Sequence, residues 1–147
     1  MPSLTTLTLI GVVVAVVLVV IFLRVRQKDM LAALMAKRRA TTNIKAMSRA
    51  DFMEGAESLE VALSFTGDTL YYENPDLEAT FELARIDEIE YDDELTTGKN
   101  VDPTKVVLRL RSHGRSFEFV IDKADAAKWK AELPARAMGS APAAHAV

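Results

Sequence analysis

The chain has 147 residues, 50% of them hydrophobic, with 18 lysines and arginines, 21 aspartates and glutamates, and no cysteine. This length fits one domain with accessory segments, and the lack of cysteine excludes disulfide frameworks, thiol catalysis and cysteine-ligated zinc. The net charge of −3 averages over three different regions. Residues 1–23 carry no charged side chain, residues 24–50 carry eight basic groups and one acid (+7), and residues 51–135 carry nine basic groups and twenty acids (−11).

An apolar run from Leu4 to Leu23 opens the chain. About 20 apolar residues in a helix cross a bilayer core of about 30 Å, and a helix satisfies every backbone hydrogen bond in lipid. A cleaved signal peptide is the alternative, but it would need a basic segment before the run and a small-x-small cleavage site after it. Instead, residues 1–3 have no basic side chain, and Arg24 and Arg26 follow the run at once. The sequence therefore predicts an uncleaved transmembrane anchor over residues 1–23.

Positive charge after the run predicts the orientation of the anchor. Basic residues near the end of a span retain that flank in the cytoplasm. We therefore expect a single-pass protein of the plasma (cytoplasmic or inner) membrane, with its N-terminus outside and its C-terminal domain in the cytoplasm. The residues of this predicted membrane collar are Arg24, Arg26, Lys28, Lys37, Arg38 and Arg39.

Residues 24–56 are predicted to form a basic, helical juxtamembrane linker. Apolar residues recur at helical spacing in residues 27–40. A capping-box pattern, Ser48-Arg49-Ala50-Asp51, indicates a second, short helix that runs to Glu54 and is closed by Gly55. Basic side chains here can contact anionic headgroups, at about 1 kcal/mol each, as in a lipid-sensing interfacial helix. The simpler interpretation, which we favour, is a collar that fixes the topology and spaces the following domain from the membrane.

From Leu59 the hydrophobic period changes to two, which predicts half-buried strands. Gly67-Asp68 offers a two-residue hairpin turn. Pairing across this turn sets Leu63 opposite Tyr72, so the apolar faces of the two strands coincide. The four predicted strands of this region lie near residues 59–65, 69–72, 79–83 and 88–92.

A second hairpin gives the clearest local signal. Apolar residues alternate over residues 106–110 and 117–121, on either side of a His113-Gly114 turn. The predicted register sets Arg109 opposite Glu118, an opposite-charge pair that contributes roughly 0.2–1 kcal/mol.

A helix is predicted after the second hairpin. Asp122 can cap its N-terminus, Trp129 and Leu133 lie on its apolar stripe, and Pro134 stops it. We expect Trp129 and Leu133 to plug the open end of a curved sheet, with about 200 Å² of the tryptophan buried. Residues 135–147 form an Ala/Pro-rich tail that is expected to be disordered.

This order of elements resembles the pleckstrin-homology (PH) superfold, especially the bacterial PH-like and GRAM-like domains. The resemblance implies an α+β protein in which the transmembrane helix precedes a small, curved antiparallel sheet or barrel, residues 57–134, capped by a C-terminal helix. Six strands can be assigned where that fold has seven, so the seventh would lie within residues 52–58 or 95–104. The patterns that carry the resemblance are Leu70-Tyr71-Tyr72, Leu83…Ile86…Ile89, Phe117-Glu118-Phe119 and Trp129…Leu133.

Charge decides what this resemblance implies about ligands. Phosphoinositide-binding members of the family use basic residues around the first hairpin, whereas the turn here, Thr66-Gly67-Asp68-Thr69, carries an acid and no base. A domain of charge −11 also repels anionic headgroups and the phosphates of nucleic acids. The resemblance therefore implies a protein-interaction or scaffolding module, with no nucleic-acid partner.

An acidic run at residues 87–94 predicts the partner surface. Carboxylate oxygens such as these are the ligands that calcium prefers, but the EF-hand spacing with its central glycine is missing. We interpret the run as the solvent face of a strand that could dock a basic partner. An exposed Tyr71, on the strand face opposite Tyr72, is a candidate anchor. The candidate partner surface comprises Tyr71, Glu88, Glu90, Asp92 and Asp93.

No arrangement of residues in the sequence predicts catalysis. His113 falls in a predicted turn and His145 in the tail, and no nucleophile–base pattern or phosphate-binding glycine loop can be identified. We therefore expect no catalytic residue, no cofactor and no metal site.

These features predict a membrane-tethered, cytoplasmic, non-catalytic scaffolding module. Tethering raises the concentration of the domain near membrane partners. The expected contacts are the bilayer through residues 4–23, anionic headgroups at the collar, and an unidentified protein partner. The alternative is a small accessory subunit of a membrane complex, recognised through its transmembrane helix, with Gly11 and Ala15 as a small-residue packing face.

Overall fold

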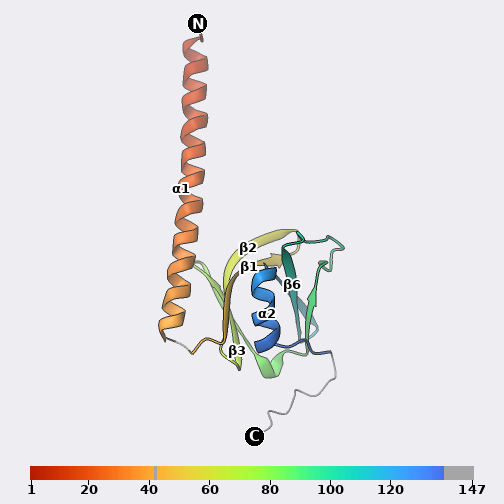
Figure 1. Ribbon diagram of the computed structural model, residues 1–147. Helices are drawn as coiled ribbons and strands as arrows, with labels where there is room; N and C mark the ends of the chain where they lie inside the picture. Colours follow the sequence, from red (N-terminus) through yellow and green to blue (C-terminus); the bar gives the residue numbers. More distant parts are fainter. Residues whose placement is uncertain (42, 138–147) are drawn as a thin grey trace.

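The computed structural model describes residues 1–41 and 43–137. It is an α+β structure, as predicted, in which a long N-terminal helix precedes a curled, seven-stranded antiparallel sheet and a C-terminal helix (Figure 1). The elements are α1 (Leu4–Thr41), β1 (Ala46–Glu54), β2 (Glu57–Phe65), β3 (Thr69–Asn74), β4 (Leu77–Glu82), the 3₁₀ turn η1 (Leu83–Arg85), β5 (Glu88–Asp92), β6 (Lys105–Ser112), β7 (Arg115–Asp122) and α2 (Lys123–Glu132).

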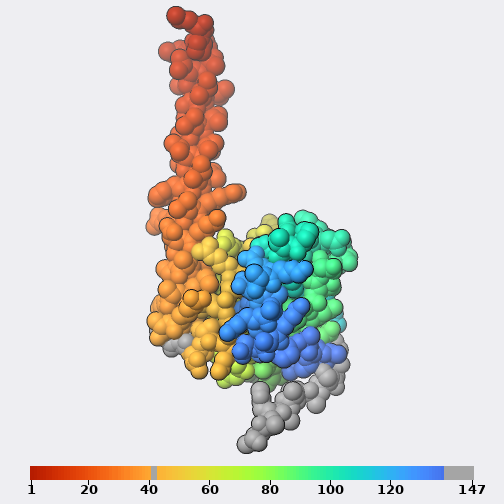
Figure 2. All heavy atoms as spheres, in the orientation of Figure 1, coloured from red at the N-terminus to blue at the C-terminus, as the bar shows by residue number. Residues whose placement is uncertain are grey.

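Helix α1 joins the predicted span and the predicted linker helix into one unbroken element. Its 38 residues correspond to about 57 Å at 1.5 Å per residue. The helix is long and apolar enough to cross a membrane, and its N-terminal half stands clear of the domain (Figures 1 and 2). Because a bilayer core takes up only about 30 Å of this length, the C-terminal part of α1 is left to interact with the domain.

The strands follow the order β4-β3-β2-β1-β7-β6-β5 in the sheet. The predicted hairpin registers are confirmed: Leu63 lies opposite Tyr72 in the β2–β3 pair, and Arg109 lies opposite Glu118 in the β6–β7 pair. The sheet curls so that one face encloses the hydrophobic core, and α2 closes its open side (Figure 1).

The short helix predicted from Ser48 to Glu54 is wrong, because this segment is strand β1. The strand pairs with β2 along its whole length and with β7 over residues 50–53. Pairing on both sides satisfies more backbone hydrogen bonds than a single helical turn could, so it outweighs the local capping pattern. Strand β1 is the missing seventh strand. It begins at Ala46, inside the range assigned to the linker, while residues 95–104 contain no named strand.

Trp129 of α2 and Leu133, at the C-cap of this helix, belong to the buried core. Trp129 and Leu133 are each only 1% exposed, and the indole N–H of Trp129 donates a 2.9 Å hydrogen bond to Ser48 Oγ. Asp122 occupies the N-cap position, but its carboxylate accepts no hydrogen bond from the helix and pairs with Lys105. Helix α2 is therefore held by packing against the core rather than by its expected cap.

The chain after α2 does not leave the sheet at once, as the predicted disordered tail would. Two backbone hydrogen bonds of 2.8 and 2.9 Å join Arg136 to Ile89 on the outer side of β5. Arg136, within the segment predicted to be disordered, is thus paired with β5. Residues 138–147, including His145, lie outside the described residues.

The central place of β1 can be tested with two fragments. Residues 44–137 should unfold cooperatively on heating, because the fragment keeps all seven strands and α2 and is well above the roughly 40 residues below which added cross-links are usually needed. Residues 51–137, which lack half of β1 and Ser48, should show no cooperative transition. Equal thermal transitions for the two fragments would contradict a sheet built around β1.

Candidate functional site

The C-terminal half of α1 packs on the outer face of strands β2 and β3. Leu31 is 2% exposed and is the one buried residue of α1 among those whose side chains are described. Strand β2 is buried on both faces from Val61 to Phe65, although Ala62 and Ser64 alternate with the core residues. The helix therefore covers a sheet face that the alternating pattern assigns to solvent.

A side chain of α1 fastens this contact. The Arg38 guanidinium donates two hydrogen bonds of 2.9 and 3.0 Å to the buried Glu73 carboxylate. It approaches Glu78 to 3.4 Å and lies 4.4 Å from the centre of the Tyr71 ring. A bidentate arginine–carboxylate pair is strong and directional, and the aromatic face adds a cation–π contact. We call Arg38, Glu73 and Tyr71 the helix latch.

The helix latch changes the interpretation of the predicted collar. Arg38 follows Arg24 by 14 positions, which is about 21 Å along a helix. In a helix normal to the bilayer, Lys37, Arg38 and Arg39 thus lie beyond the headgroup layer when Arg24 is within it. If α1 spans the membrane in this way, the residues within reach of the headgroups are the upper ones, Arg24, Arg26 and Lys28.

The latch also changes the interpretation of Tyr71. This side chain was expected to be exposed, but it is half-buried, with the Arg38 guanidinium over its ring. The tyrosine contacts the chain's own helix, so its aromatic face is only partly open to another protein.

A second charged cluster is centred on Arg109, a buried residue that is only 9% exposed. The guanidinium lies 3.1 Å from Glu118, 2.8 Å from Glu90 and 3.3 Å from Asp92, and it donates a 2.7 Å hydrogen bond to the Glu94 carbonyl. The cross-strand pair predicted for Arg109 and Glu118 is therefore buried, and it also fixes the start of the 93–104 loop. A second contact holds the loop: the Thr96 backbone N–H donates a 3.1 Å hydrogen bond to the Glu118 carboxylate.

Most of the predicted acidic partner surface is paired within the domain. Glu90 and Asp92 face Arg109, and Glu88 lies 3.6 Å from Arg111. Hydrogen bonds from the Asp93 backbone N–H and from Arg109 lower the pKa of the Asp92 carboxyl. The face is less negative than its composition suggests because Arg109 and Arg111 offset part of the charge of these carboxylates. The β5–β6 register, which sets Glu88 opposite Arg111 and Glu90 opposite Arg109, is the signal that could have revealed this pairing.

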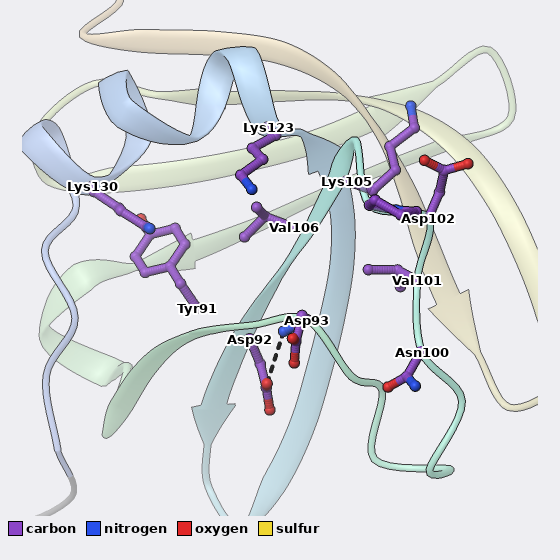
Figure 3. Close-up of a pocket in the computed structure, with 11 residues that line it drawn as sticks. Tyr91, Asp92, Asp93, Asn100, Val101, Asp102, Lys105, Val106, Lys123 and Lys130 are labelled. Carbon is purple, nitrogen blue, oxygen red and sulfur yellow. Dashed lines mark hydrogen bonds between the residues drawn. The ribbon is translucent and has the colours of Figure 1, made fainter.

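A groove of 660 Å³ lies between α2, β5, the 93–104 loop and the start of β6 (Figure 3). It is on the side of the domain away from α1 (Figure 1). Lys123 and Lys130 of α2 line one side, and the pair Asp92–Asp93 lies across from them (Figure 3). We call it the α2–β5 groove.

The chemistry of the α2–β5 groove suits binding. The Tyr91 hydroxyl donates a 2.6 Å hydrogen bond to the Leu133 carbonyl, and burial raises the pKa of this phenol well above its usual value. The phenol is thus a neutral structural group at ordinary pH. Within residues 1–41 and 43–137, no group of three or more His, Asp or Glu side chains could hold a metal ion. Lys123 and Asp93 form no ion pair in these same ranges, so charges of both signs remain to meet a ligand.

Comparisons of the sequence with family models and with curated proteins find no match. The likeness to PH domains therefore rests on form: a curled antiparallel sheet of seven strands whose open side is closed by a C-terminal helix.

The Arg109 cluster gives a stability prediction. Arg109→Met should lower the free energy of unfolding of residues 44–137 by about 3–5 kcal/mol, because Glu118 is then left buried without its cation. Arg111→Met, which removes the more exposed pair with Glu88, is the matched control and should cost less than about 1 kcal/mol. Replacing Arg109 and Glu118 together with Met and Leu should recover most of the loss. If urea titrations gave similar losses of unfolding free energy for the two single variants, Arg109 would not be the buried centre of the cluster.

The helix latch gives a second prediction. Arg38→Gln in the full chain should speed amide hydrogen exchange in residues 31–41 by about tenfold or more, since hydrogen bonds to charged groups contribute about 1.5–3 kcal/mol. Arg39→Gln is the control, because Arg39 is exposed and neighbours Arg38 on the same helix. Equal exchange in the two variants, measured by mass spectrometry in detergent micelles, would refute the latch.

Proposed function

We propose that this protein is a single-pass protein of the cytoplasmic membrane that holds a non-catalytic, PH-like interaction domain against the cytoplasmic face. The observation that carries the proposal is the continuity of α1. One helix provides an apolar segment of membrane-spanning length and, without a break, the surface that docks on β2 and β3. The domain is therefore placed by a rigid element rather than by a flexible linker.

Charge supports the proposed orientation. The +7 region of residues 24–50 follows the apolar run directly, and positive charge on a flank retains it in the cytoplasm. Such a tether raises the effective concentration of the domain near other membrane proteins. A fixed helix adds a geometric condition, because only partners that reach the exposed side of the domain can bind.

The α2–β5 groove is the surface that best suits a protein partner. It faces away from α1, so a partner reaches it without displacing the anchor (Figure 1). Lys123 and Lys130 lie on one side and Asp92 and Asp93 on the other (Figure 3), which favours an extended segment that carries charges of both signs. Its polar residues include no nucleophile hydrogen-bonded to a base, which favours binding over catalysis.

In-membrane photocrosslinking tests this function. A photoreactive residue in place of Lys123 should trap one discrete protein partner in intact membranes, whereas the same residue in place of Thr80, an exposed position on β4, should not. A reporter that is active only in the cytoplasm, fused after Val147, should be active. An inactive reporter would overturn the orientation, and equal crosslinking at the two positions would overturn the assignment of the groove.

Exchange of residues 4–23 for an unrelated apolar span separates this function from that of an accessory subunit. Tethering should survive the exchange, with the Lys123 crosslink retained. Loss of the crosslink with normal membrane insertion would instead indicate recognition through the span. Gly11 has open space where a Cβ would lie, so Gly11→Leu in the native span provides a milder form of the same test.

A further inference from the structure

A second groove, of 360 Å³, lies where α1 diverges from the domain. Leu31 of the helix packs against the sheet, and the Arg49 side chain of β1 reaches the Lys28 carbonyl at 3.5 Å, but nearer its N-terminus the helix rises clear of the strands (Figures 1 and 2). The start of β2 and the β3–β4 turn form the opposite wall. We call this space the helix–tip groove; its lining includes Leu23, Arg26, Met30, Leu59, Glu60 and Asp76.

The helix–tip groove lies at the depth of the lipid headgroups if α1 spans the membrane. Leu23 ends the apolar run and Leu31 marks the bottom of the groove, eight residues or about 12 Å lower along the helix. The headgroup region on each side of a bilayer is roughly 5–8 Å thick. The headgroup region therefore lies at the same depth as the upper part of the groove. Lipid is then the molecule present at the highest concentration at the opening of the groove.

The lining of the groove combines a cation, carboxylates and apolar side chains. Arg26 and Asp76 form no ion pair within residues 1–41 and 43–137. The Glu60 carboxylate forms a 3.7 Å ion pair with the Arg49 guanidinium, and both side chains are partly exposed. Met30 and Leu59 expose 42% and 39% of their surfaces. A ligand that fits must therefore carry a negative group, a positive group and an apolar part.

We propose that the helix–tip groove binds an aminophospholipid, a zwitterionic lipid whose headgroup joins a phosphate to a primary ammonium. Arg26 would bind the phosphate, the carboxylates of Asp76 and Glu60 would accept hydrogen bonds from the ammonium, and the acyl chains would lie along Leu23, Met30 and Leu59. Each of the two headgroup contacts pairs opposite charges. This inference rests on the membrane insertion proposed above.

The same lining disfavours other lipids. An anionic headgroup would bring its phosphate to Arg26 but would leave Asp76 and Glu60 facing negative charge. A choline headgroup has no N–H to donate to these carboxylates, and the lining residues include no aromatic ring, the usual recognition element for a quaternary ammonium. The ammonium of an aminophospholipid supplies the missing donors.

Native mass spectrometry of the full chain, released from lipid nanodiscs, tests the proposal. In nanodiscs with equal amounts of phosphatidylethanolamine and phosphatidylcholine, one phosphatidylethanolamine should remain bound preferentially. Arg26→Gln and Asp76→Asn should each reduce this retention about tenfold, as expected for loss of a charge-assisted contact. The matched controls are Arg24→Gln, on the same helix, and Asp68→Asn, in the β2–β3 turn at the other end of the domain; both should retain the lipid.

Several results would overturn the inference. Equal retention of the two lipids, or equal losses in the variants and their controls, would show that the groove does not select the headgroup. A preference for phosphatidylglycerol that falls equally in Arg24→Gln and Arg26→Gln would indicate a nonspecific basic collar, and a peptide found in the groove instead of lipid would exclude the proposed ligand. Failure of the chain to insert into nanodiscs would remove the membrane function itself, which distinguishes it from a failure of lipid selection.

Discussion

The docking of α1 on the sheet is the constraint on which the arrangement of this protein depends. The same helix carries an apolar run and, lower down, the Arg38 guanidinium that binds buried Glu73. If the two parts were separated by a flexible linker, the domain could rotate freely and either of its grooves could face the membrane. Because the helix is unbroken and fastened, the β1–β2 and β3–β4 turns lie toward the apolar run, whereas the α2–β5 groove opens on the far side (Figure 1). The positions of both proposed binding surfaces thus follow from one helix–sheet contact.

The hairpins and the closing helix could be predicted because their signals are local. Gly67 and Gly114 have positive φ angles of 105° and 75°, and apolar residues alternate on both sides of each turn, which leaves one register that buries them together. The strand β1 could not be predicted in this way. Its buried residues are the small Ala46, Ser48 and Ala50, which give little hydrophobic contrast, and its conformation is set by β2, β7 and Trp129, all of which come later in the chain. A local capping pattern was therefore the stronger signal over this segment, and it was misleading.

The candidate site was predicted less well than the fold, because side-chain pairing between strands is not visible in composition. The run at residues 87–94 is acidic in sequence, but the β5–β6 register sets two of its carboxylates opposite Arg109 and Arg111. Likewise, the Tyr71 face of β3 is covered by a helix that lies more than thirty residues earlier in the chain. The α2–β5 groove combines residues from β5, a loop, β6 and α2, and its existence depends on how the sheet curls. Sequence periodicity identified each of these elements, but not the space between them.

The segregation of charge along the chain acquires a structural explanation from these contacts. Residues 24–50 carry +7 and residues 51–135 carry −11. The two regions therefore attract each other, in addition to attracting charged partners outside the protein. Arg38 binds Glu73 and Glu78, and Arg49 approaches Glu60, so part of the positive region is used within the protein. Within the described residues, the basic residues nearest the apolar run, Arg24 and Arg26, form no such ion pair, and in the proposed orientation they lie, with Lys28, at the depth of the headgroups. One basic segment can thus serve two functions that depth separates: its upper residues meet lipid, and its lower residues hold the acidic domain in place.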